Sequence, residues 1–484
     1  MKNKNPWTWV PSLYFAEGLP YVIVMTISVV MYKQLGLSNA DITLYTSWLY
    51  LPWVIKPLWS PFVDVIKTKR WWITAMQLLV GAALGGVAFT IPSSSWLQFT
   101  LFFFWIMAFA SATHDIAADG FYMLGLEEHD QAWFVGIRST FYRLATIFGQ
   151  GILVMIAGNI QVLFRYNIGY SWCLVFYGVC GLFIALWLWH GFILPRPQED
   201  KGLEHLNANQ LMSELKHTVV TFFTKLPKKE IAIAILFMLL YRMPEGLLAK
   251  VTPLFLLDSR TTGGLGLSPQ EYGLVQGTVG VIGLTLGGIL GGILAGRDGM
   301  KRWLWPMVCA ITLPDVVYIY LSYASLSDML SISAFAAFAT LFTMIVAYIV
   351  GTIFNITKNY LFLVILLLVV IPPLWFFTTP STPSSLLIIS ICIFIEQFGY
   401  GFGFTAYMLY LIYFSQGPYK TSHYALCTAF MALSMMLPGM VSGKLQQIMG
   451  YQSFFILVMI LCVVTFIVTY FIKVDPSFGK KKEE

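Results

Sequence analysis

Three ionisable side chains, His114, Asp115 and Asp119, lie close together in an otherwise apolar stretch of the chain. Asp115 and Asp119 are four residues apart, so on a helix they share a face, where like charges repel. One of them is then expected to retain a proton, as a proton carrier must. The same residues could hold a metal or act as a base, but no second cluster of His, Asp or Glu completes such a site. An enzyme is therefore the distant alternative, and we expect no metal and no cofactor.

The residues before this stretch, 96–110, are apolar enough to lie in a lipid bilayer, where a charged side chain costs about 2.5 to 3.5 kcal/mol. The whole chain has this character: 58% of its 484 residues are hydrophobic and 11% are charged, against about 25% in soluble domains. The composition predicts an all-α, polytopic membrane protein. The net charge of +6 follows the membrane topology, so we expect no nucleic-acid partner.

Apolar runs of about 20 residues, the length that crosses about 30 Å of hydrocarbon, predict fourteen membrane-spanning helices. The predicted spans are 8–32, 42–66, 71–91, 97–123, 133–159, 170–194, 229–257, 269–296, 302–324, 331–351, 359–378, 385–414, 421–449 and 452–473. The interval 195–228 is polar, and its segment 203–223 has the apolar spacing of an amphipathic helix at the membrane surface.

Basic residues are distributed unequally between the loops on the two sides of the predicted spans. With the amino terminus inside, only Lys33, Arg165 and Arg260 fall in external loops, whereas the basic tail at 474–484 is internal. Lysine and arginine accumulate in the cytoplasmic loops of membrane proteins. We therefore expect both termini to lie in the cytoplasm.

Short segments recur in the same order in two parts of the chain. Glu-Gly-Leu at 17–19 recurs at 245–247, Leu-Gly-Leu-Ser at 35–38 recurs at 265–268, and Lys-Arg-Trp at 69–71 recurs at 301–303. Such parallel repeats are typical of two halves related by an axis along the membrane normal. We predict a six-helix half at 1–194, an amphipathic linker at 195–228, a second half at 229–473 with an inserted helix pair at about 331–378, and a basic tail at 474–484.

Two arginines in the next predicted helix offer partners to the two aspartates. Counted from the helix ends, Asp119 lies at the depth of Arg138, and Asp115 lies at the depth of Arg143. These residues could form ion pairs that lock two helices together. Alternatively, a carboxylate could take up a proton and release an arginine to an anionic solute. Both interpretations stay open at this point.

Charged and polar residues inside the predicted spans are candidates for a solute path. The candidates for proton coupling or gating are Asp115, Asp119, Glu17, Glu245 and Glu396. The candidates for solute binding are His114, Arg138, Arg143, Lys56, Arg242, Lys250 and Tyr400. The candidates for conformational loop motifs are Asp64, Lys69, Arg70, Arg297, Lys301 and Arg302.

Two sets of motifs resemble known families. The loop at 292–302 resembles the signature Gly-x3-Asp-Arg-x-Gly-x-Lys/Arg-Lys/Arg of the major facilitator superfamily, with Gly296 in place of the aspartate; the earlier copy keeps Asp64 and lacks the glycines. Gly-Leu-Pro at 18–20, Trp-Ser-Pro-x-x-Asp at 59–64 and Ser-Ala-Thr-His-Asp-x3-Asp at 111–119 are similar to the AmpG-type muropeptide permeases and the related acetyl-CoA transporter family. His114 stands where those families have glutamine.

The resemblance to AmpG-type permeases implies a two-half transporter that imports anhydromuropeptides from cell-wall turnover, driven by protons, across a bacterial inner membrane. Its acidic site would map onto Asp115 and Asp119. We therefore expect an anionic glycopeptide as the solute, protons as the coupling ion, lipid as the surroundings and a monomeric protein. Another organic anion, such as an acyl-CoA or other carboxylate, is the alternative solute.

Overall fold

The computed structural model describes residues 5–198, 200, 208–324, 384–417, 420–476 and 478–479. Every regular element in these residues is helical, as the sequence predicts for an all-α protein. Ten helices in this part of the chain are long and apolar enough to cross a membrane. The protein is therefore a multi-pass membrane protein.

The helices fall into two groups along the chain. The first group is α1 (Val10–Val22), a π-helix (Ile23–Ile27), α2 (Ser28–Gln34), α3 (Asn39–Trp48), α4 (Leu51–Val65), α5 (Lys69–Thr90), α6 (Trp96–Gly125), α7 (Glu128–Ile147), a π-helix (Phe148–Leu153), α8 (Val154–Leu163) and α9 (Ile168–Ile193). After α10 (Ala208–Thr224), the second group is α11 (Lys228–Leu240), α12 (Met243–Leu257), α13 (Pro269–Tyr272), a π-helix (Gly273–Gly280), α14 (Val281–Asp298), α15 (Met300–Thr312), α16 (Val316–Ala324), α19 (Ser384–Ser415) and α20 (Lys420–Phe471).

Each predicted span that falls on described residues coincides with helix. The span predicted at 42–66 is divided into α3 and α4, and those predicted at 421–449 and 452–473 are two arms of α20 that meet at Gly450. The inserted pair predicted at about 331–378 lies outside the described residues. The count of fourteen helices therefore stays a prediction.

Proline and glycine residues lie where these helices are interrupted. A proline has no backbone N–H and removes an intrahelical hydrogen bond, and Pro20 precedes the π-helix at Ile23–Ile27. Pro52 lies in the first turn of α4, where its missing N–H would have no intrahelical acceptor. Gly450 has a φ of 74°, which residues with a side chain rarely adopt. The first two breaks lie within four residues of Glu17 and Lys56 along the chain.

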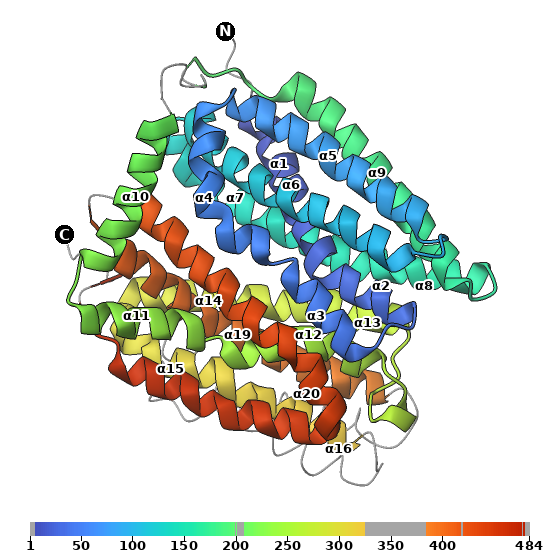
Figure 1. Ribbon diagram of the computed structural model, residues 1–484. Helices are drawn as coiled ribbons and strands as arrows, with labels where there is room; N and C mark the ends of the chain where they lie inside the picture. Colours follow the sequence, from blue (N-terminus) through green and yellow to red (C-terminus); the bar gives the residue numbers. More distant parts are fainter. Residues whose placement is uncertain are drawn as a thin grey trace, which may run out of the picture.

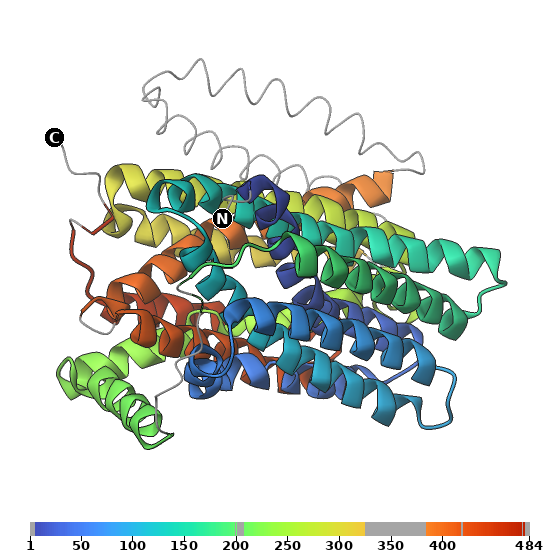
Figure 2. The ribbon, with the colours of Figure 1, turned by 90° about the horizontal axis from the view of Figure 1, so that it is seen from above.

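The helices run approximately along one common direction (Figure 1), and Figure 2 shows the same elongated arrangement from above. Within the first group α5 packs on α6 and α9, within the second α14 packs on α19, and α3 packs on α20 between the groups. The loops 35–38, 164–167 and 258–268 lie at one end, which we call the Lys33 end. The loops 66–68 and 126–127 lie at the opposite end, the Arg70 end.

The helix predicted in the linker is present as α10, which crosses the end of the molecule where both termini lie (Figure 1). Phe222 of α10 contacts the ring of Phe414 in the second group, with ring centres 5.4 Å apart. Lys225 lies 3.7 Å from the centre of the same ring and donates a hydrogen bond to the Phe414 carbonyl oxygen. Earlier in the linker, the Asp200 carboxylate accepts hydrogen bonds of 2.7 and 3.1 Å from the first two N–H groups of α5. The linker is thus attached to both groups of helices.

A polar network joins the two groups of helices at the Lys33 end. Lys33 of α2 forms an ion pair of 2.5 Å with Asp258 after α12, and it donates a hydrogen bond of 2.7 Å to Asn39. The Asn39 amide donates hydrogen bonds to Gln446 at 2.8 Å and to the Tyr451 hydroxyl at 3.1 Å. Tyr451 in turn donates to Asp258 at 2.5 Å. Because these residues come from both groups, the network holds the Lys33 end closed.

The helices α3 and α20 approach closely beside this network. The Gly443 N–H donates a hydrogen bond of 3.0 Å to Thr43 Oγ1. A Cβ atom on Gly443 would lie 2.2 Å from the Asn39 carbonyl oxygen, far inside van der Waals contact. The closed Lys33 end therefore requires glycine at this position.

We expect Gly443→Val to hold the Lys33 end open, because the added side chain overlaps the backbone of α3 in the closed arrangement. Hydrogen exchange in lipid nanodiscs, followed by mass spectrometry, should rise several-fold at residues 35–48 and 258–268. Gly292→Val is the matched control, since a Cβ there meets no atom within 4 Å. Unchanged exchange in Gly443→Val would contradict this account of the closure.

Candidate functional site

Charged residues from four helices meet inside the first group. They are Glu17 of α1, Lys56 of α4, Asp115 and Asp119 of α6, and Arg138 of α7. We call these five residues the acidic cluster. In membrane-spanning helices an unpaired charge is costly, so the pairing of each member decides what it can do.

Asp115 is held by α4. Its carboxylate lies 3.7 Å from Lys56 Nζ and accepts a hydrogen bond of 3.0 Å from Trp53 Nε1. The predicted pairing of Asp115 with Arg143 is therefore wrong, because α4 rather than α7 supplies the cation. Equal depth along two helices does not determine which of several neighbouring helices a side chain faces. Lys56 faces a carboxylate in this conformation, and its predicted role in solute binding stays a prediction.

The predicted pairing of Asp119 with Arg138 is formed. Arg138 Nη1 lies 3.2 Å from Asp119 Oδ1 and donates a hydrogen bond of 3.0 Å to the Tyr14 hydroxyl. The guanidinium also lies 5.0 Å from the ring centres of Tyr14 and Tyr122, within the range of cation–π attraction. The side chains of Arg138 and Asp119 are 35% and 47% exposed, compared with 26% and 17% for Lys56 and Asp115.

Glu17 is the member of the acidic cluster that lacks a partner among the described residues. Its side chain is buried, with 8% of the residue exposed, and Oε2 has no hydrogen-bond donor. Its electrostatic neighbours are the two aspartates of α6 together with Lys56 and Arg138. Glu17 therefore lies beside two pairs of oppositely charged residues that are already in contact with one another.

Arg143 of α7 lies where the two groups of helices face each other. The residue is half-buried, and its electrostatic neighbours are Tyr142 and, from α19, Tyr400. Within the described part of the chain, no hydrogen bond or ion pair joins its guanidinium to another residue. Among the described residues, Arg143 is thus a cation without an anion paired to it.

Arg242, just before α12, approaches the same tyrosine from the second group. Its guanidinium donates a hydrogen bond to the Tyr400 hydroxyl and lies 4.6 Å from the ring centre of Phe404 and 5.7 Å from that of Tyr407. Arg242 Nε has no acceptor among the described residues. Tyr400 consequently has an arginine from each group as a neighbour, and we call Arg143, Arg242 and Tyr400 the central site.

Further aromatic residues of the first group adjoin the central site. Tyr21 is an electrostatic neighbour of both Arg242 and Tyr50. The rings of Tyr21 and Trp53 meet edge to face, with centres 5.2 Å apart. Because Trp53 also holds Asp115, aromatic contacts connect the central site to the acidic cluster.

Lys250 of α12 lies at the boundary between the two groups, with 2% of the residue exposed. Its ammonium donates hydrogen bonds to the carbonyl oxygens of Met25 at 3.0 Å and Thr46 at 3.4 Å. It also lies 5.3 Å from the ring centre of Tyr50. In this conformation Lys250 therefore links α12 to the first group, and its predicted role in solute binding stays a prediction.

Glu245 and Glu396 are buried inside the second group. Glu396 Oε2 accepts hydrogen bonds of 2.9 Å from the Tyr318 hydroxyl and of 2.9 Å from the Gln397 amide. Glu245 has Glu396 and Arg242 as electrostatic neighbours. Asp315, which no sequence motif singled out, is an electrostatic neighbour of both glutamates.

His114 lies in the interior of the first group, with 2% of the residue exposed. Its Nε2 is 3.0 Å from the Gln77 amide nitrogen, and the Gln77 amide oxygen is 2.9 Å from His190 Nδ1. His190 Nε2 is in turn 2.9 Å from Ser12 Oγ. This chain of polar contacts joins α6, α5, α9 and α1. His114 directly precedes Asp115, but one residue turns a helix by about 100°, so its side chain lies in the helix packing. Its predicted role in solute binding stays a prediction.

An aspartate outside the expected motif position holds the basic loop of the second group. Asp298 lies 2.9 Å from Arg297 Nη2 and 3.8 Å from Arg302 Nη1, and it accepts a hydrogen bond of 2.8 Å from Trp303 Nε1. It thereby supplies a carboxylate where Gly296 has none. The sequence could have indicated this, because Asp298 lies only two residues further on.

The first copy of the loop is held differently. Arg70 donates a hydrogen bond to the Gly191 carbonyl oxygen, and Asp200 of the linker binds the backbone at the start of α5, which begins at Lys69. Asp64 belongs to the last turn of α4. Lys301 is exposed near the start of α15. The two copies therefore share a basic pair and differ in the carboxylate that accompanies it.

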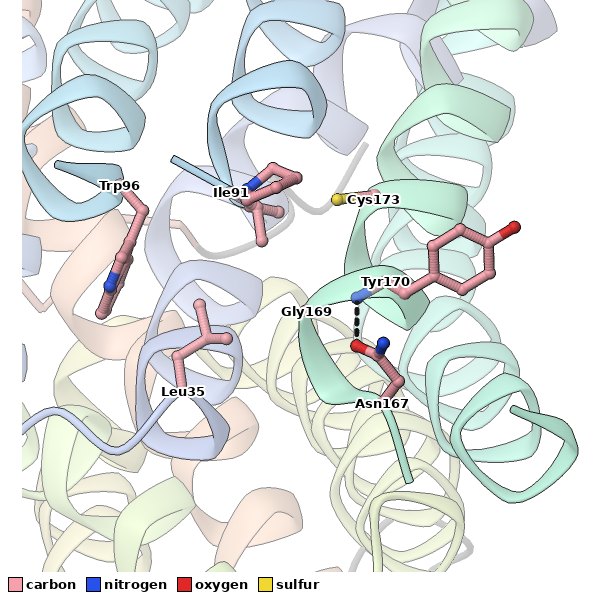
Figure 3. A pocket seen from close by; sticks show the side chains of 8 residues that line it. Leu35, Ile91, Trp96, Asn167, Gly169, Tyr170 and Cys173 are labelled. Atoms are coloured by element: carbon pink, nitrogen blue, oxygen red, sulfur yellow. Dashed lines mark hydrogen bonds between the residues drawn. The ribbon is translucent and has the colours of Figure 1, made fainter. Parts of the chain in front are cut away.

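A cavity of about 280 Å³ lies at the Lys33 end of the first group (Figure 3). Trp96, Ile91, Leu35 and Cys173 line it, and its polar side chain, Asn167, accepts a hydrogen bond of 3.0 Å from the Tyr170 N–H. Its lining includes no residue of the acidic cluster or the central site. The cavity is therefore separate from the charged residues.

The two ion pairs of the acidic cluster should differ in their effect on stability. We expect Asp115→Asn to lower the free energy of unfolding by about 1 to 3 kcal/mol, because it leaves the Lys56 ammonium without a carboxylate. Asp119→Asn should cost about 1 kcal/mol or less, because its pair is more exposed. Denaturant unfolding of the purified variants in detergent compares the two losses. A larger loss for Asp119→Asn would contradict this ranking.

The sequence is similar to those of known transport proteins, although no protein-family model matches it. It is 23% identical over 458 residues to the protein named AmpG 4 of Rickettsia conorii, covering 93% of this chain and 92% of that relative. It is also 23% identical over 299 residues to the anhydromuropeptide permease of Escherichia coli, covering 60% of this chain and 56% of that relative.

Solved transporter structures share the fold. The nucleoside transporter NupG matches with a TM-score of 0.60 and 15% identity, over 98% of this chain and 100% of that one. A D-xylose-proton symporter matches with a TM-score of 0.62 and 13% identity, over 98% of this chain and 99% of that one. The resemblance to the AmpG-type permeases is confirmed by these similarities, and the protein is a multi-pass transporter with the fold of the major facilitator superfamily.

Proposed function

We propose that the protein is a proton-coupled importer of anhydromuropeptides and that the solute binds at the central site. The observation that carries this proposal is the Arg143 guanidinium, which faces Tyr400 and has no carboxylate partner in the described residues. An unpaired cation in that position is energetically costly in an apolar helix bundle unless an anion neutralises its charge. A solute carboxylate would be such an anion.

The chemistry of the central site suits a carboxylate. Arginine presents planar N–H donors that bind the two oxygens of a carboxylate in parallel. Arg143 comes from the first group of helices and Arg242 from the second, and Arg242 Nε has an unused donor among the described residues. A carboxylate bound by both would favour the arrangement in which the groups close around the solute.

The aromatic residues beside the central site suit the sugar part of a glycopeptide. Tyr21 and Tyr50 each combine an apolar ring face with a hydroxyl group, as sugar recognition requires. The similarity to a relative named an anhydromuropeptide permease supports a solute of this class. Sugar rings, peptide bonds and carboxylates would each find a matching group at this position.

Two alternatives to this solute and this activity have less support. Another organic anion, such as an acyl-CoA or other carboxylate, would also bind two arginines. An enzyme would need its reactive groups to converge, but His114 contacts Gln77 whereas Asp115 contacts Trp53 and Lys56. Among the described residues, no group of three or more His, Cys, Asp or Glu is placed to hold a metal ion.

We further propose that the Arg70 end faces the cytoplasm of a bacterium, with both termini there and the protein in the inner membrane as a monomer. The basic loops at that end, including 67–70 and 297–302, support this orientation. The Lys33 end would then close the outer entrance. The two groups of helices would correspond to the halves 1–194 and 229–473, joined by the linker 195–228 and followed by the tail 474–484.

Arg143→Gln should reduce uptake of a labelled anhydromuropeptide about tenfold or more. A hydrogen bond to a charged group contributes roughly 1.5 to 3 kcal/mol, and this variant removes the charge. Uptake is measured in vesicles with an imposed inward pH gradient. Arg260→Gln, at an exposed arginine of the loop 258–268, is the matched control and should transport like the wild type.

The outcomes separate the solute from the site. Wild-type uptake of an acyl-CoA or another carboxylate, without uptake of the anhydromuropeptide, would replace the proposed solute and keep the arginines as its site. Full uptake of the anhydromuropeptide by Arg143→Gln would show that the solute binds elsewhere.

A further inference from the structure

We propose that Glu17 is the residue that binds and releases the coupling proton. The two aspartates of α6 then stay ionised, each paired with its own cation. This inference rests on the proposed proton-coupled transport and assigns the proton to one carboxylate of the acidic cluster. The sequence motif, in contrast, draws attention to the aspartates.

The charges of the acidic cluster do not balance. Lys56 is paired with Asp115 at 3.7 Å, and Arg138 is paired with Asp119 at 3.2 Å. Both cations of the cluster are therefore neutralised by the aspartates. Glu17 is a third carboxylate, and no cation in the described part of the chain is paired with it. If it were ionised, the cluster would carry an excess negative charge inside an apolar bundle, which is costly. A bound proton removes that cost.

The surroundings of Glu17 also point to a proton. The residue is 8% exposed, and its buried Oε2 has no hydrogen-bond donor among the described residues. A buried carboxylate oxygen with no donor is strongly unfavourable, whereas a neutral carboxyl group tolerates the position better. The group has both ion pairs of the acidic cluster as electrostatic neighbours, so a change in either pair would change its proton affinity.

The titratable and charged neighbours of Glu17 among the described residues allow it to bind a proton and to release it. The neighbours are Asp115 and Asp119 on α6, Lys56 on α4, Arg138 and Tyr142 on α7, and Tyr14 on its own helix. His190 on α9 contacts α1 at Ser12, more than a turn from Glu17. Release of the proton would leave a carboxylate that Lys56 or Arg138 can share with its aspartate.

The backbone around Glu17 connects it to the central site. The next residue, Gly18, lies against α7: a Cβ there would be 3.1 Å from the Tyr142 carbonyl oxygen. Tyr142 directly precedes Arg143, which belongs to the central site. Three residues beyond Glu17, Pro20 and then the π-helix Ile23–Ile27 interrupt the first helix, and π-helical turns are frequent at functional positions. A movement of α7 on solute binding would therefore displace the backbone next to Glu17.

The test compares two kinds of transport by Glu17→Gln in proteoliposomes. Exchange of labelled for unlabelled anhydromuropeptide needs no net proton movement, so we expect it to stay within about twofold of the wild type. Accumulation driven by an inward pH gradient needs the proton. In the wild type it can raise the ratio of internal to external solute up to about tenfold per pH unit for each proton moved, and we expect Glu17→Gln to lose this accumulation completely. Glu230→Gln is the control, because Glu230 forms an exposed ion pair with Lys473 at 3.7 Å, and it should retain both activities.

Two results would overturn the assignment. If Glu17→Gln still accumulates solute with the pH gradient, another group carries the proton. If it loses exchange as well, while its unfolding temperature and gel-filtration profile match the wild type, Glu17 serves solute binding or the conformational change rather than coupling.

A second measurement needs no solute, so it separates failure of this inference from failure of the proposed solute. Hydrogen exchange at residues 35–38 and 258–268 is compared at pH 5.5 and pH 8 in nanodiscs, after correction for the intrinsic rate. We expect the wild type and Glu230→Gln to open to different extents at the two pH values, and Glu17→Gln to open equally at both. The same pH dependence in Glu17→Gln as in the wild type would overturn the assignment even if no anhydromuropeptide is transported.

Discussion

Each charge inside the membrane-spanning helices has to be neutralised by a neighbour, and this constraint determines how the helices of the protein are arranged. The pair Lys56–Asp115 joins α4 to α6, and the pair Arg138–Asp119 joins α6 to α7. Among the described residues inside the first group, this pairing leaves over the acid Glu17 and the base Arg143. One is suited to a proton and the other to an anion, so the unpaired charges are the positions at which a transported species can change the energy of the protein.

The two groups of helices satisfy this constraint in different ways. The first group contains cations for two of its three clustered carboxylates. In the second group, Glu245, Glu396 and Asp315 are mutual neighbours, and the nearby cation is Arg242. Neutral donors take part there instead: the Tyr318 hydroxyl and an amide both bind Glu396. The repeat in the sequence therefore preserves the backbone plan, while the electrostatics of the two groups have diverged.

The sequence predicts the helices of the described residues well, because apolar runs of membrane length are rarely ambiguous. It also predicts the Asp119–Arg138 pair, since those residues lie on consecutive helices at one depth. It fails for Asp115, whose partner lies on α4, because depth does not determine lateral position. His114 is adjacent to Asp115, but one residue turns a helix by about 100°, so it faces the packing against Gln77. The π-helices and the network around Asn39 have no local sequence pattern that marks them.

The attachment of the linker has a consequence for how far the protein can open. Asp200 is bound to the start of α5 in the first group, and α10 is packed on the second group at Phe222. The chain between these two attachment points can reach at most roughly 47 to 50 Å, because eight extended residues span roughly 26 to 29 Å and the 14 residues of α10 before Phe222 add about 21 Å. It therefore acts as a tether of limited length across the Arg70 end: the groups can separate there only until the tether is taut. Its length sets an upper limit on the width of the opening, and hence on the size of a molecule that can leave through it.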